Sequence, residues 1–337
     1  MAEHYVIIGN GPAANEAAVA LRERNKTARI TMIGRESRGY YRPDLLPRYV
    51  SGKIGIQGVY VFPVVHYGDI DIQLRLGQEV VNVDFAHRVL TLYHKELVYF
   101  DGLIIATGGV PRIPKPLQVY ERLLLKLKTV EDADRWKKSL PYVRTVALIG
   151  GDLTSLAFSK ELMDLGKQVT FVLDDNCFWP LGCDDPQKAD VIKRLERRGV
   201  QVVDGRKISG ATKIADYDYT LDTAGGGVRA GLLGAFFGLK PNVGFLAHSG
   251  LHIEQGILVD ETLQTCFEGV YAAGDCAQVY SPQLGAYWVS IGYRNAKHLG
   301  RVAAENLLGG RIEAQSAKNS IFDVEGISVS NAWWTEF

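Results

Sequence analysis

Apolar residues in this chain fall into short runs, and several of these runs are followed by a segment with apolar positions at helical spacing. Residues 5–8 form the first run, residues 16–24 carry alanines and a leucine on one helical face, and residues 28–33 form the next run. Short apolar runs separated by an amphipathic helix are typical of parallel strand–helix–strand units. A second unit of the same kind is predicted at residues 145–149, 156–165 and 168–173.

The turn after the first run reads GNGPAA, which matches the G-x-G-x-x-G/A pattern of dinucleotide-binding turns. Gly9 permits a sharp turn, Gly11 lets a pyrophosphate approach the backbone, and Ala14 is small enough for the helix to pack on the strand. The start of the helix offers free amides and the positive end of its dipole to a phosphate. The predicted cofactor-binding residues of this turn are Gly9, Gly11, Pro12, Ala13 and Ala14.

An acidic residue, Glu36, follows the second predicted strand and is placed to accept hydrogen bonds from an adenosine ribose. A glycine-rich turn alone is weak evidence, because such turns are also found with a purely structural role. Here the strand, helix, second strand and acid follow one another in the order that the chemistry needs. The sequence therefore favours a dinucleotide site over a structural turn.

The turn of the second unit departs from this pattern. Gly150 is kept, but Asp152 stands at the second glycine and Ser155 at the third small residue. A carboxylate about 4 Å from a pyrophosphate repels it by about 4 kcal/mol at an effective dielectric near 20, about a thousandfold in affinity. Leu173 holds the place of the ribose acid, with Asp174 one position later. We expect a scaffold that binds NAD(P)H weakly or not at all; the alternative is NADH bound in a shifted geometry with Asp174.

Composition limits the function classes. The chain has 337 residues, 47% hydrophobic and 23% charged, with 38 basic and 38 acidic residues, which is typical of a soluble α/β protein and gives no case for nucleic acid or an anionic membrane. No apolar run approaches the ~18 residues of a membrane span. The first strand begins about four residues from the start, which leaves no room for a cleavable signal. A cytoplasmic location is the default expectation.

The cysteines suggest no redox pair or metal site. None of the four stands in a C-x-x-C motif, and the five residues between Cys177 and Cys183 fit no common zinc spacing. We expect ordinary thiols, with a disulfide between Cys177 and Cys183 as the alternative. The other two cysteines are Cys266 and Cys276.

Four segments, the first turn and residues 41–43 (YRP), 103–108 (LIIATG) and 257–277, together resemble the FAD-dependent pyridine nucleotide–disulfide oxidoreductases, especially the ferredoxin-, rubredoxin- and nitrite-reductase type. In that family the YRP-like loop passes the isoalloxazine, the strand of LIIATG ends beside the cofactor, and the aspartate of a G-D pair binds the ribityl chain. The helix after the G-D pair points its N-terminus at the flavin. The resemblance covers nearly the whole chain and implies FAD as cofactor. It adds these site residues: Arg42, Ala106, Thr107, Gly108, Gly274 and Asp275.

Simpler interpretations exist for three of these features. Asp275 could be a helix N-cap, and Arg42 could be a solvated loop cation. The pair Trp333–Trp334 could seal a core, contact the flavin or meet a partner.

The resemblance also implies the domain organisation. We expect an α/β protein with two Rossmann-like nucleotide-binding domains, in which the NAD-like domain, 113–235, is inserted into a discontinuous FAD domain, 1–112 and 236–337. The boundaries rest on residues 111–116 (PRIPKP) and the glycine-rich residues 223–234.

Several family features are missing. No cysteine lies between Glu36 and Tyr60, where the disulfide-reductase branch keeps its redox pair, so disulfide reduction is not expected. Pro47, with Arg48 beside it, replaces a lysine near the flavin, and Ala157 replaces a glutamate after the second turn. The sequence stops soon after a segment that resembles the end of the FAD domain, whereas many relatives continue into an interface domain. We therefore expect no dimer of that type and a flavin region open to another protein.

These observations lead to three functional hypotheses. The first is an FAD-dependent oxidoreductase that passes electrons between its flavin and a protein-borne redox centre, such as an iron–sulfur subunit, within a larger complex. In this hypothesis no acid–base side chain carries the chemistry. The second is a self-sufficient NADH-dependent reductase of rubredoxin, ferredoxin or a similar carrier. The third is an assembly module in which FAD is only structural.

Overall fold

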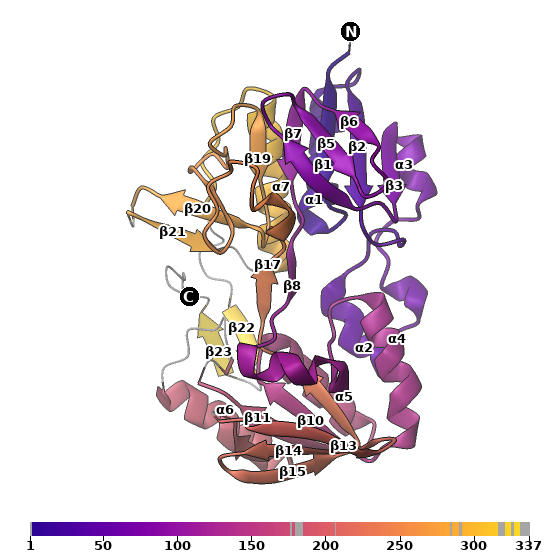
Figure 1. The fold of residues 1–337 in the computed structure, drawn as a ribbon, viewed down its shortest axis with the longest axis vertical. Coiled ribbons are helices and arrows are strands. Elements are labelled where there is room, and N and C mark those ends of the chain that lie inside the picture. The colour runs from indigo at the N-terminus through magenta and orange to yellow at the C-terminus, as the bar shows by residue number, and fades with distance from the viewer. Residues whose placement is uncertain are drawn as a thin grey trace.

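The computed structural model describes residues 2–175, 177–178, 185–205, 207–283, 285–289, 292–315, 321–324 and 327–330. Two five-stranded parallel sheets lie in two units at opposite ends of the molecule (Figure 1). They are joined by the antiparallel pair β8 (Gly109–Pro111) and β17 (Leu239–Pro241). We call these parts the first unit, which contains the N-terminus, and the second unit. This arrangement confirms the predicted α/β fold with two Rossmann-like units.

The sheet of the first unit has the strand order β19-β7-β1-β2-β3. Helices α1 (Pro12–Arg24) and α7 (Tyr293–Leu307) pack against each other and against this sheet. Their approach is close: a Cβ atom on Gly300 would lie 2.1 Å from the carbonyl oxygen of Ala13. Glycine at this position is therefore a packing requirement of the fold. The strands are β1 (His4–Ile8), β2 (Arg29–Gly34), β3 (Ile72–Leu76), β7 (Gly102–Ile105) and β19 (Val270–Ala272).

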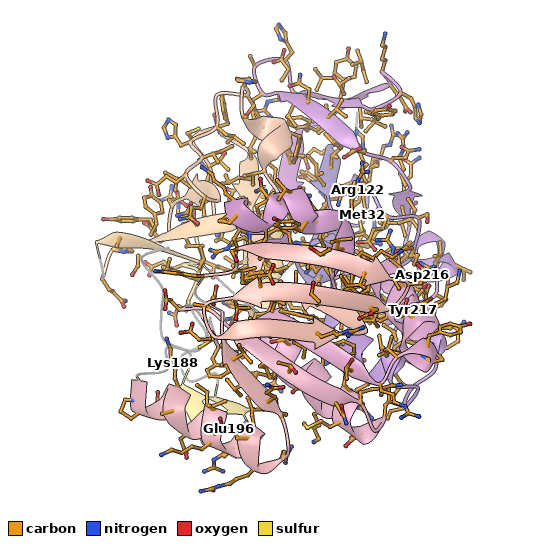
Figure 2. All side chains as sticks on the ribbon, turned by 60° about the horizontal axis from the view of Figure 1, so that its bottom comes forward. Met32, Arg122, Lys188, Glu196, Asp216 and Tyr217 are labelled. Atoms are coloured by element: carbon orange, nitrogen blue, oxygen red, sulfur yellow. The ribbon has the colours of Figure 1, made fainter. Side chains whose placement is uncertain are left out.

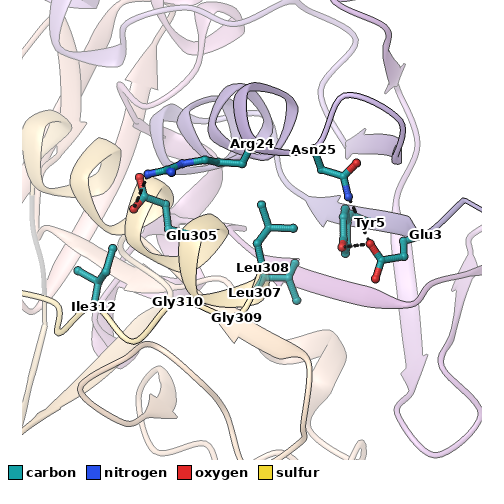
Figure 3. Close-up of a pocket in the computed structure, with 10 residues that line it drawn as sticks. All are labelled: Glu3, Tyr5, Arg24, Asn25, Glu305, Leu307, Leu308, Gly309, Gly310 and Ile312. Atoms are coloured by element: carbon teal, nitrogen blue, oxygen red, sulfur yellow. Dashed lines mark hydrogen bonds and ion pairs between the residues drawn. The ribbon is translucent and has the colours of Figure 1, made fainter.

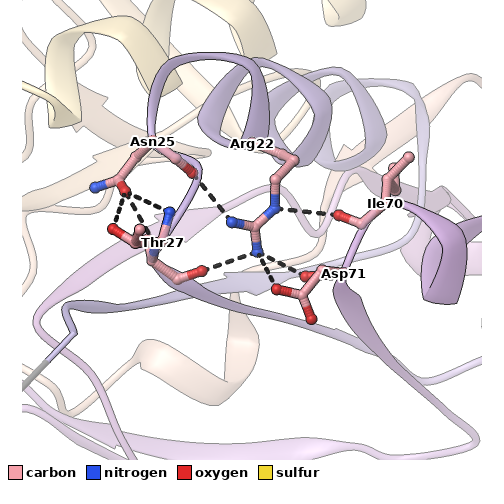
Figure 4. A network of polar contacts seen from close by, with 6 residues as sticks. Arg22, Asn25, Thr27, Ile70 and Asp71 are labelled. Atoms are coloured by element: carbon pink, nitrogen blue, oxygen red, sulfur yellow. Dashed lines mark hydrogen bonds and ion pairs between the residues drawn. The ribbon is translucent and has the colours of Figure 1, made fainter.

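A buried arginine fixes the far end of α1 (Figure 4). The guanidinium of Arg22 donates to the carbonyl oxygens of Ala28, at 2.8 Å, and Ile70, at 3.1 Å, and pairs with Asp71 at 3.3 Å. Arg22 is only 9% exposed, and its guanidinium donates mainly to backbone carbonyl oxygens. It therefore ties α1 to the starts of β2 and β3.

The sheet of the second unit has the order β12-β11-β10-β16-β9 and is covered on both faces. Alternate residues of its strands point to opposite sides, so Val146 and Leu148 pack with the helices while Ala147 and Ile149 pack under a three-stranded antiparallel sheet. Figure 2 looks onto that smaller sheet, with Asp216 and Tyr217 at a hairpin turn. The elements are β9 (Leu124–Leu125), β10 (Thr145–Gly150), β11 (Gln168–Leu173), β12 (Gln201–Asp204), β13 (Gly210–Ala215), β14 (Asp218–Thr223), β15 (Gly226–Ala230), β16 (Leu232–Ala235), α4 (Val130–Ser139), α5 (Leu153–Asp164) and α6 (Asp185–Arg197).

Helix α2 (Leu46–Val50) belongs to the N-terminal part of the sequence but packs in the second unit. Leu46 is fully buried in the same apolar cluster as the core of α4 and α5. At its C-terminal end the hydroxyl of Ser51 donates to Glu161 of α5, at 2.5 Å. The hydroxyl of Tyr49 donates to Asp134 of α4 at 2.7 Å. This segment therefore bridges the two units.

The remaining elements cover the first unit or follow it. They are α3 (Val65–Asp69), the antiparallel strands β4 (Val80–Asp84), β5 (Val89–Leu92) and β6 (Leu97–Tyr99), the strands β18 (Ile257–Val259), β20 (Ala277–Ser281) and β21 (Ala286–Val289), and the hairpin β22 (Ile321–Val324) and β23 (Ile327–Ser330). Among the helices that the structure describes, none combines the length and the apolar character needed to cross a bilayer.

Candidate functional site

The first predicted site lies where the strand order of the first sheet reverses. Strands β2 and β3 are added on one side of β1, and the later strands β7 and β19 are added on its other side. Ligands of such sheets bind at the carboxyl ends of the two strands that flank this reversal. At that point Gly9, with a φ of +134°, follows β1, and a Cβ atom on it would lie 2.2 Å from the carbonyl oxygen of Ala106. Gly9 is required by the fold itself.

Gly11 differs from Gly9, because a Cβ atom on Gly11 would meet no atom within 4 Å. It precedes α1, whose first turn has neither a side-chain cap nor an acidic residue. The side chain of Asn15 holds the turn by donating to the carbonyl oxygens of Asn10, at 2.9 Å, and Gly11, at 3.0 Å. The amides at the helix start are therefore left for an external anion, and the open space beside Gly11 fits a pyrophosphate.

Glu36 lies two residues beyond β2, on the same edge of the sheet. Its carboxylate Oε2 accepts a hydrogen bond of 2.6 Å from the hydroxyl of Tyr41. Burial raises the pKa of Glu36, the Tyr41 hydrogen bond opposes this, and the nearby charges of Glu131, Lys128 and Arg35 add smaller effects. A partly buried acid at this edge is the group that a ribose diol needs.

Gly274 and Asp275 follow β19, and Gly274, with a φ of +77°, packs against the start of α1, where a Cβ atom would lie 3.1 Å from that of Ala13. Burial raises the pKa of the Asp275 carboxyl, and the charge of Lys128 partly opposes this. Asp275 stands in the turn before strand β20, so its interpretation as a helix N-cap is wrong. The helix expected after the G-D pair begins only at Tyr293, beyond the hairpin of β20 and β21.

Thr107 and Gly108 follow β7 at the same edge. The hydroxyl of Thr107 donates to the carbonyl oxygen of Asn242 at 2.9 Å, and the carbonyl oxygen of Gly108 accepts from the Asn242 amide at 2.9 Å. Gly108 has a φ of +63° and a Cβ on it would meet no atom within 4 Å. The two chain crossings between the units are therefore fastened together directly beside the predicted cofactor site.

Arg42 is a partly exposed loop cation that makes two defined contacts. Its guanidinium pairs with Asp44 at 2.5 Å and lies 4.8 Å from the ring centroid of Tyr293, the first residue of α7. The Tyr293 hydroxyl shares a hydrogen bond of 2.9 Å with that of Tyr40. The structure thus brings the YRP loop to the start of α7, although the pairing with Asp44 uses much of the charge of Arg42.

Lys128 was missed by the sequence analysis. It lies between β9 and α4 of the second unit, yet its charge lowers the pKa of both Glu36 and Asp275, which belong to the first unit. The charge of Lys128 therefore acts on both acids at the edge where the predicted adenosine and ribityl contacts lie. No local pattern around Lys128 signals this role, because it depends on how the second unit folds back over the first.

The turn of the second unit keeps the first glycine, which the fold requires, but has Asp152 in place of the second. A Cβ atom on Gly150 would lie 2.3 Å from the carbonyl oxygen of Phe236. Gly9 is in the same situation, because a Cβ atom there would lie against the carbonyl oxygen of Ala106. Asp152 caps α5: its Oδ1 accepts from the Ser155 amide at 2.9 Å, and its Oδ2 from the Gly238 amide at 3.1 Å. Burial raises the pKa of Asp152 to about 6, against these amides. The chain's own carboxylate fills the anion position of this helix.

The segment after β11 closes further over this turn. The amide of Phe178 donates to the carbonyl oxygen of Gly151 at 2.7 Å, and Phe178 is fully buried. A Cβ atom on Gly151 would lie 2.6 Å from Leu173 and 3.2 Å from Cys177. The backbone of Gly151 is therefore covered by the protein's own residues.

Two departures from the family pattern fall at one contact. Pro47 and Ala157 each lie one helical turn before Ser51 and Glu161, which are hydrogen-bonded across α2 and α5. Both positions therefore lie on helices that pack against each other, and the charged pair at this contact is Lys53 with Glu161, at 3.0 Å.

Among the described residues, the remaining chemistry-bearing side chains gather at no second centre. Cys266 and Cys276 are free thiols, whereas Cys183, on which the alternative disulfide depends, and the Trp333–Trp334 pair lie outside the described residues. Within the described part of the chain no three or more histidine, cysteine or acidic side chains gather as they would around a metal ion. A groove of about 540 Å³ lies at the opposite end of β1 (Figure 3) and includes Glu3 and Glu305.

Comparison with known proteins agrees with this geometry. Residues 3–296 match the family model described as pyridine nucleotide-disulphide oxidoreductase. The chain is 26% identical over 336 residues to the assimilatory nitrate reductase electron transfer subunit of Bacillus subtilis (strain 168), covering 98% of this chain but 42% of that protein. It is 30% identical over 315 residues to the ferredoxin–NAD(+) reductase component of an anthranilate 1,2-dioxygenase system from Burkholderia cepacia, covering 91% and 76%.

Among solved structures, that of a covalent putidaredoxin reductase–putidaredoxin complex superposes with a TM-score of 0.85 at 24% identity, covering 97% of this chain and 80% of that one. At this level of identity the likeness concerns the fold.

Proposed function

The chain belongs to the pyridine nucleotide-disulphide oxidoreductase family, and we propose that it works there as an FAD-dependent oxidoreductase that binds NAD(P)H weakly or not at all. FAD, when bound, accepts electrons in pairs and releases them singly. In this proposal the flavin exchanges electrons with a protein-borne redox centre, for example an iron–sulfur subunit of a larger complex. The domain of residues 1–112 and 236–337 binds FAD, and the domain of residues 113–235 is a scaffold.

One observation carries this proposal: the two helix N-termini that face the two nucleotide positions differ. The start of α1 has no side-chain cap, whereas the start of α5 is capped by Asp152. The glycine that the fold needs is kept in both turns, as Gly9 and Gly150. The position that lies against open space in the first turn, Gly11, is the one that has become Asp152 in the second. The change thus removes ligand binding while it preserves the fold.

The chain's own residues bind and orient the cofactor in this proposal. The amides at the start of α1 hold the pyrophosphate, Glu36 accepts from the adenosine ribose, and Asp275 accepts from the ribityl chain. The remaining proposed contacts are Pro12, Ala13, Ala14, Arg42, Ala106, Thr107, Gly108 and Gly274. No side chain of the site is assigned a proton transfer. Pro47 and Ala157 themselves carry no charge, and the charged pair at the contact of α2 and α5 is Lys53 with Glu161, at 3.0 Å.

The relatives support an electron-transfer role. One of them is named an electron transfer subunit and another a ferredoxin–NAD(+) reductase component. This chain covers only 42% of the first of these two proteins. The partner of this chain is therefore proposed and is not taken from that name.

Anaerobic reduction tests the proposal directly. We expect the FAD-loaded protein to keep its flavin absorbance when NADH or NADPH is added, and to lose it fully with dithionite. Rapid bleaching by NADH, at a rate that supports turnover, would instead establish a self-sufficient reductase. A flavin that never changes redox state during turnover of the native complex would point to the structural module.

Lys128 provides a second test, at the FAD site. Because the charge of Lys128 lowers the pKa of both Glu36 and Asp275, we expect Lys128→Met to weaken FAD binding about tenfold, which corresponds to about 1.4 kcal/mol. Titration of the apoprotein with FAD, followed by fluorescence, measures this. The matched control is Lys126→Met, since Lys126 pairs with Glu121. Equal effects of the two substitutions would remove Lys128 from the site.

A further inference from the structure

Tyr41 lies between the two units at the predicted adenosine end of the site. Its side chain is 8% exposed, and its ring packs edge-on against Tyr60 with 6.3 Å between centroids. A backbone bridge between the same two residues fixes the start of the loop. The hydroxyl therefore has a defined position, and it is directed at Oε2 of Glu36, 2.6 Å away.

The second unit provides the other side of this contact. Tyr41 is buried in the same apolar cluster as Val130, the first residue of α4. Burial and the charge of Glu36 raise the pKa of the Tyr41 hydroxyl, and the backbone of Val130 partly opposes this. Helix α4 is well capped, because Thr129 and Asp132 form a capping box. The start of a capped helix therefore packs with the residue whose hydroxyl donates to the Glu36 carboxylate, and this donation favours the ionised acid.

The other charged residues near Glu36 leave the Tyr41 hydrogen bond as the contact that sets the orientation of its carboxylate. Glu131, one residue further along α4, repels the Glu36 carboxylate but is itself paired with Arg38 at 2.6 Å. Lys128 and Arg35 attract it without a direct hydrogen bond. In the described residues the only hydrogen bond to the Glu36 carboxylate comes from Tyr41, so Oε2 is engaged and Oε1 has no protein donor.

We propose that Tyr41 is a positioning residue for the cofactor, holding the Glu36 carboxylate in the orientation that presents it to the two hydroxyl groups of the adenosine ribose. This inference rests on the proposed FAD function and extends it. It assigns the second unit a role at the FAD site, because Tyr41 is packed in the apolar cluster that contains the start of α4. The second unit then serves the cofactor of the first, while its own turn is closed by Asp152.

The test compares two ligands and three variants. The ligands are FAD and an FAD analogue whose adenosine ribose lacks both hydroxyl groups. The variants are Tyr41→Phe, Glu36→Gln and the double variant, with Tyr49→Phe as the matched control, because Tyr49 also donates to a carboxylate, Asp134, at 2.7 Å. Dissociation constants are measured by fluorescence titration of the apoprotein, and the thermal midpoint of each apoprotein is recorded.

We expect Tyr41→Phe to raise the Kd for FAD about tenfold and to leave the Kd for the dideoxy analogue unchanged. The double variant should bind FAD no more weakly than Glu36→Gln alone, because both act on one contact. Tyr49→Phe should bind both ligands as the wild type does.

Three results would overturn the inference: wild-type affinity in Tyr41→Phe, an equal loss for both ligands, or additive losses in the double variant. An equal loss with a lowered thermal midpoint would assign Tyr41 to the fold instead. Failure of the wild-type protein to bind FAD would overturn the proposed function as well, which separates the two conclusions.

Discussion

Replacing Gly9 with alanine is expected to lower the free energy of unfolding by about 3 kcal/mol and to abolish FAD binding. A Cβ atom at this position would lie 2.2 Å from the carbonyl oxygen of Ala106. That oxygen belongs to the backbone where β7 leaves the sheet, so it cannot rotate away as a side chain would. The φ of +134° adds strain for any residue other than glycine. Backbone strain and overpacking each cost about 1–3 kcal/mol.

The matched variant is Gly11→Ala. A Cβ at Gly11 meets no protein atom within 4 Å, and its φ of −85° suits any residue. We expect wild-type stability in the apoprotein but about tenfold weaker FAD binding, because the methyl group enters the space proposed for the pyrophosphate. Denaturant unfolding and FAD titration of both variants separate the two roles. Loss of stability in Gly11→Ala, or wild-type stability in Gly9→Ala, would contradict this assignment.

Replacing Asp152 with glycine is expected to strengthen the binding of NAD⁺ about a hundredfold. The carboxylate of Asp152 accepts hydrogen bonds from the amides of Ser155 and Gly238. At ~4 Å it would repel a pyrophosphate by about 4 kcal/mol. The gain stays below the thousandfold that this repulsion represents, because Phe178 still covers Gly151. Isothermal titration of wild type and variant with NAD⁺ measures the change. Unchanged binding would show that Asp152 does not close the site.

The effects of the charge and of the volume of Asp152 on NAD⁺ binding can be distinguished with the Asp152→Asn variant and by changing the pH. Burial raises the pKa of Asp152 to about 6, so the carboxyl is ionised at pH 8 and mostly neutral at pH 5. We expect wild-type protein to bind NAD⁺ more strongly at pH 5 than at pH 8, by about tenfold, and Asp152→Asn to show little dependence over this range. A pH dependence shared by both proteins would assign it to other groups.

The sequence predicted those parts of the fold that depend on local pattern. The strand predicted at residues 168–173 is β11 as observed, and that at 5–8 differs from β1 by one residue. The helix starts were placed too late: α1 begins at Pro12 and α5 at Leu153, because the first turn of each helix is part of the glycine-rich turn and lacks the apolar spacing that marks a helix. The cofactor-binding assignments of Gly9, Gly11 and Asp275 stay predictions, to be tested by the experiments above.

What the sequence could not predict depends on contacts between distant residues. Lys128 reaches Glu36 and Asp275 only because the second unit folds back against the first. The hydrogen bond between Tyr41 and Glu36 joins residues close in sequence, but the loop conformation that directs it is set by Tyr60 and by the start of α4. Helix α2 shows no sign in its own residues of belonging to the second unit's core.

The position of α2 limits how this protein can be shortened. A variant with residues 113–235 cut out and the ends of β8 and β17 joined would uncover the buried faces of Leu46 and Val50 and leave Ser51 and Tyr49 without their carboxylate acceptors. We expect such a deletion variant to aggregate rather than yield a minimal flavin domain. Residues 113–235 are therefore needed to cover α2, whether or not they bind a coenzyme.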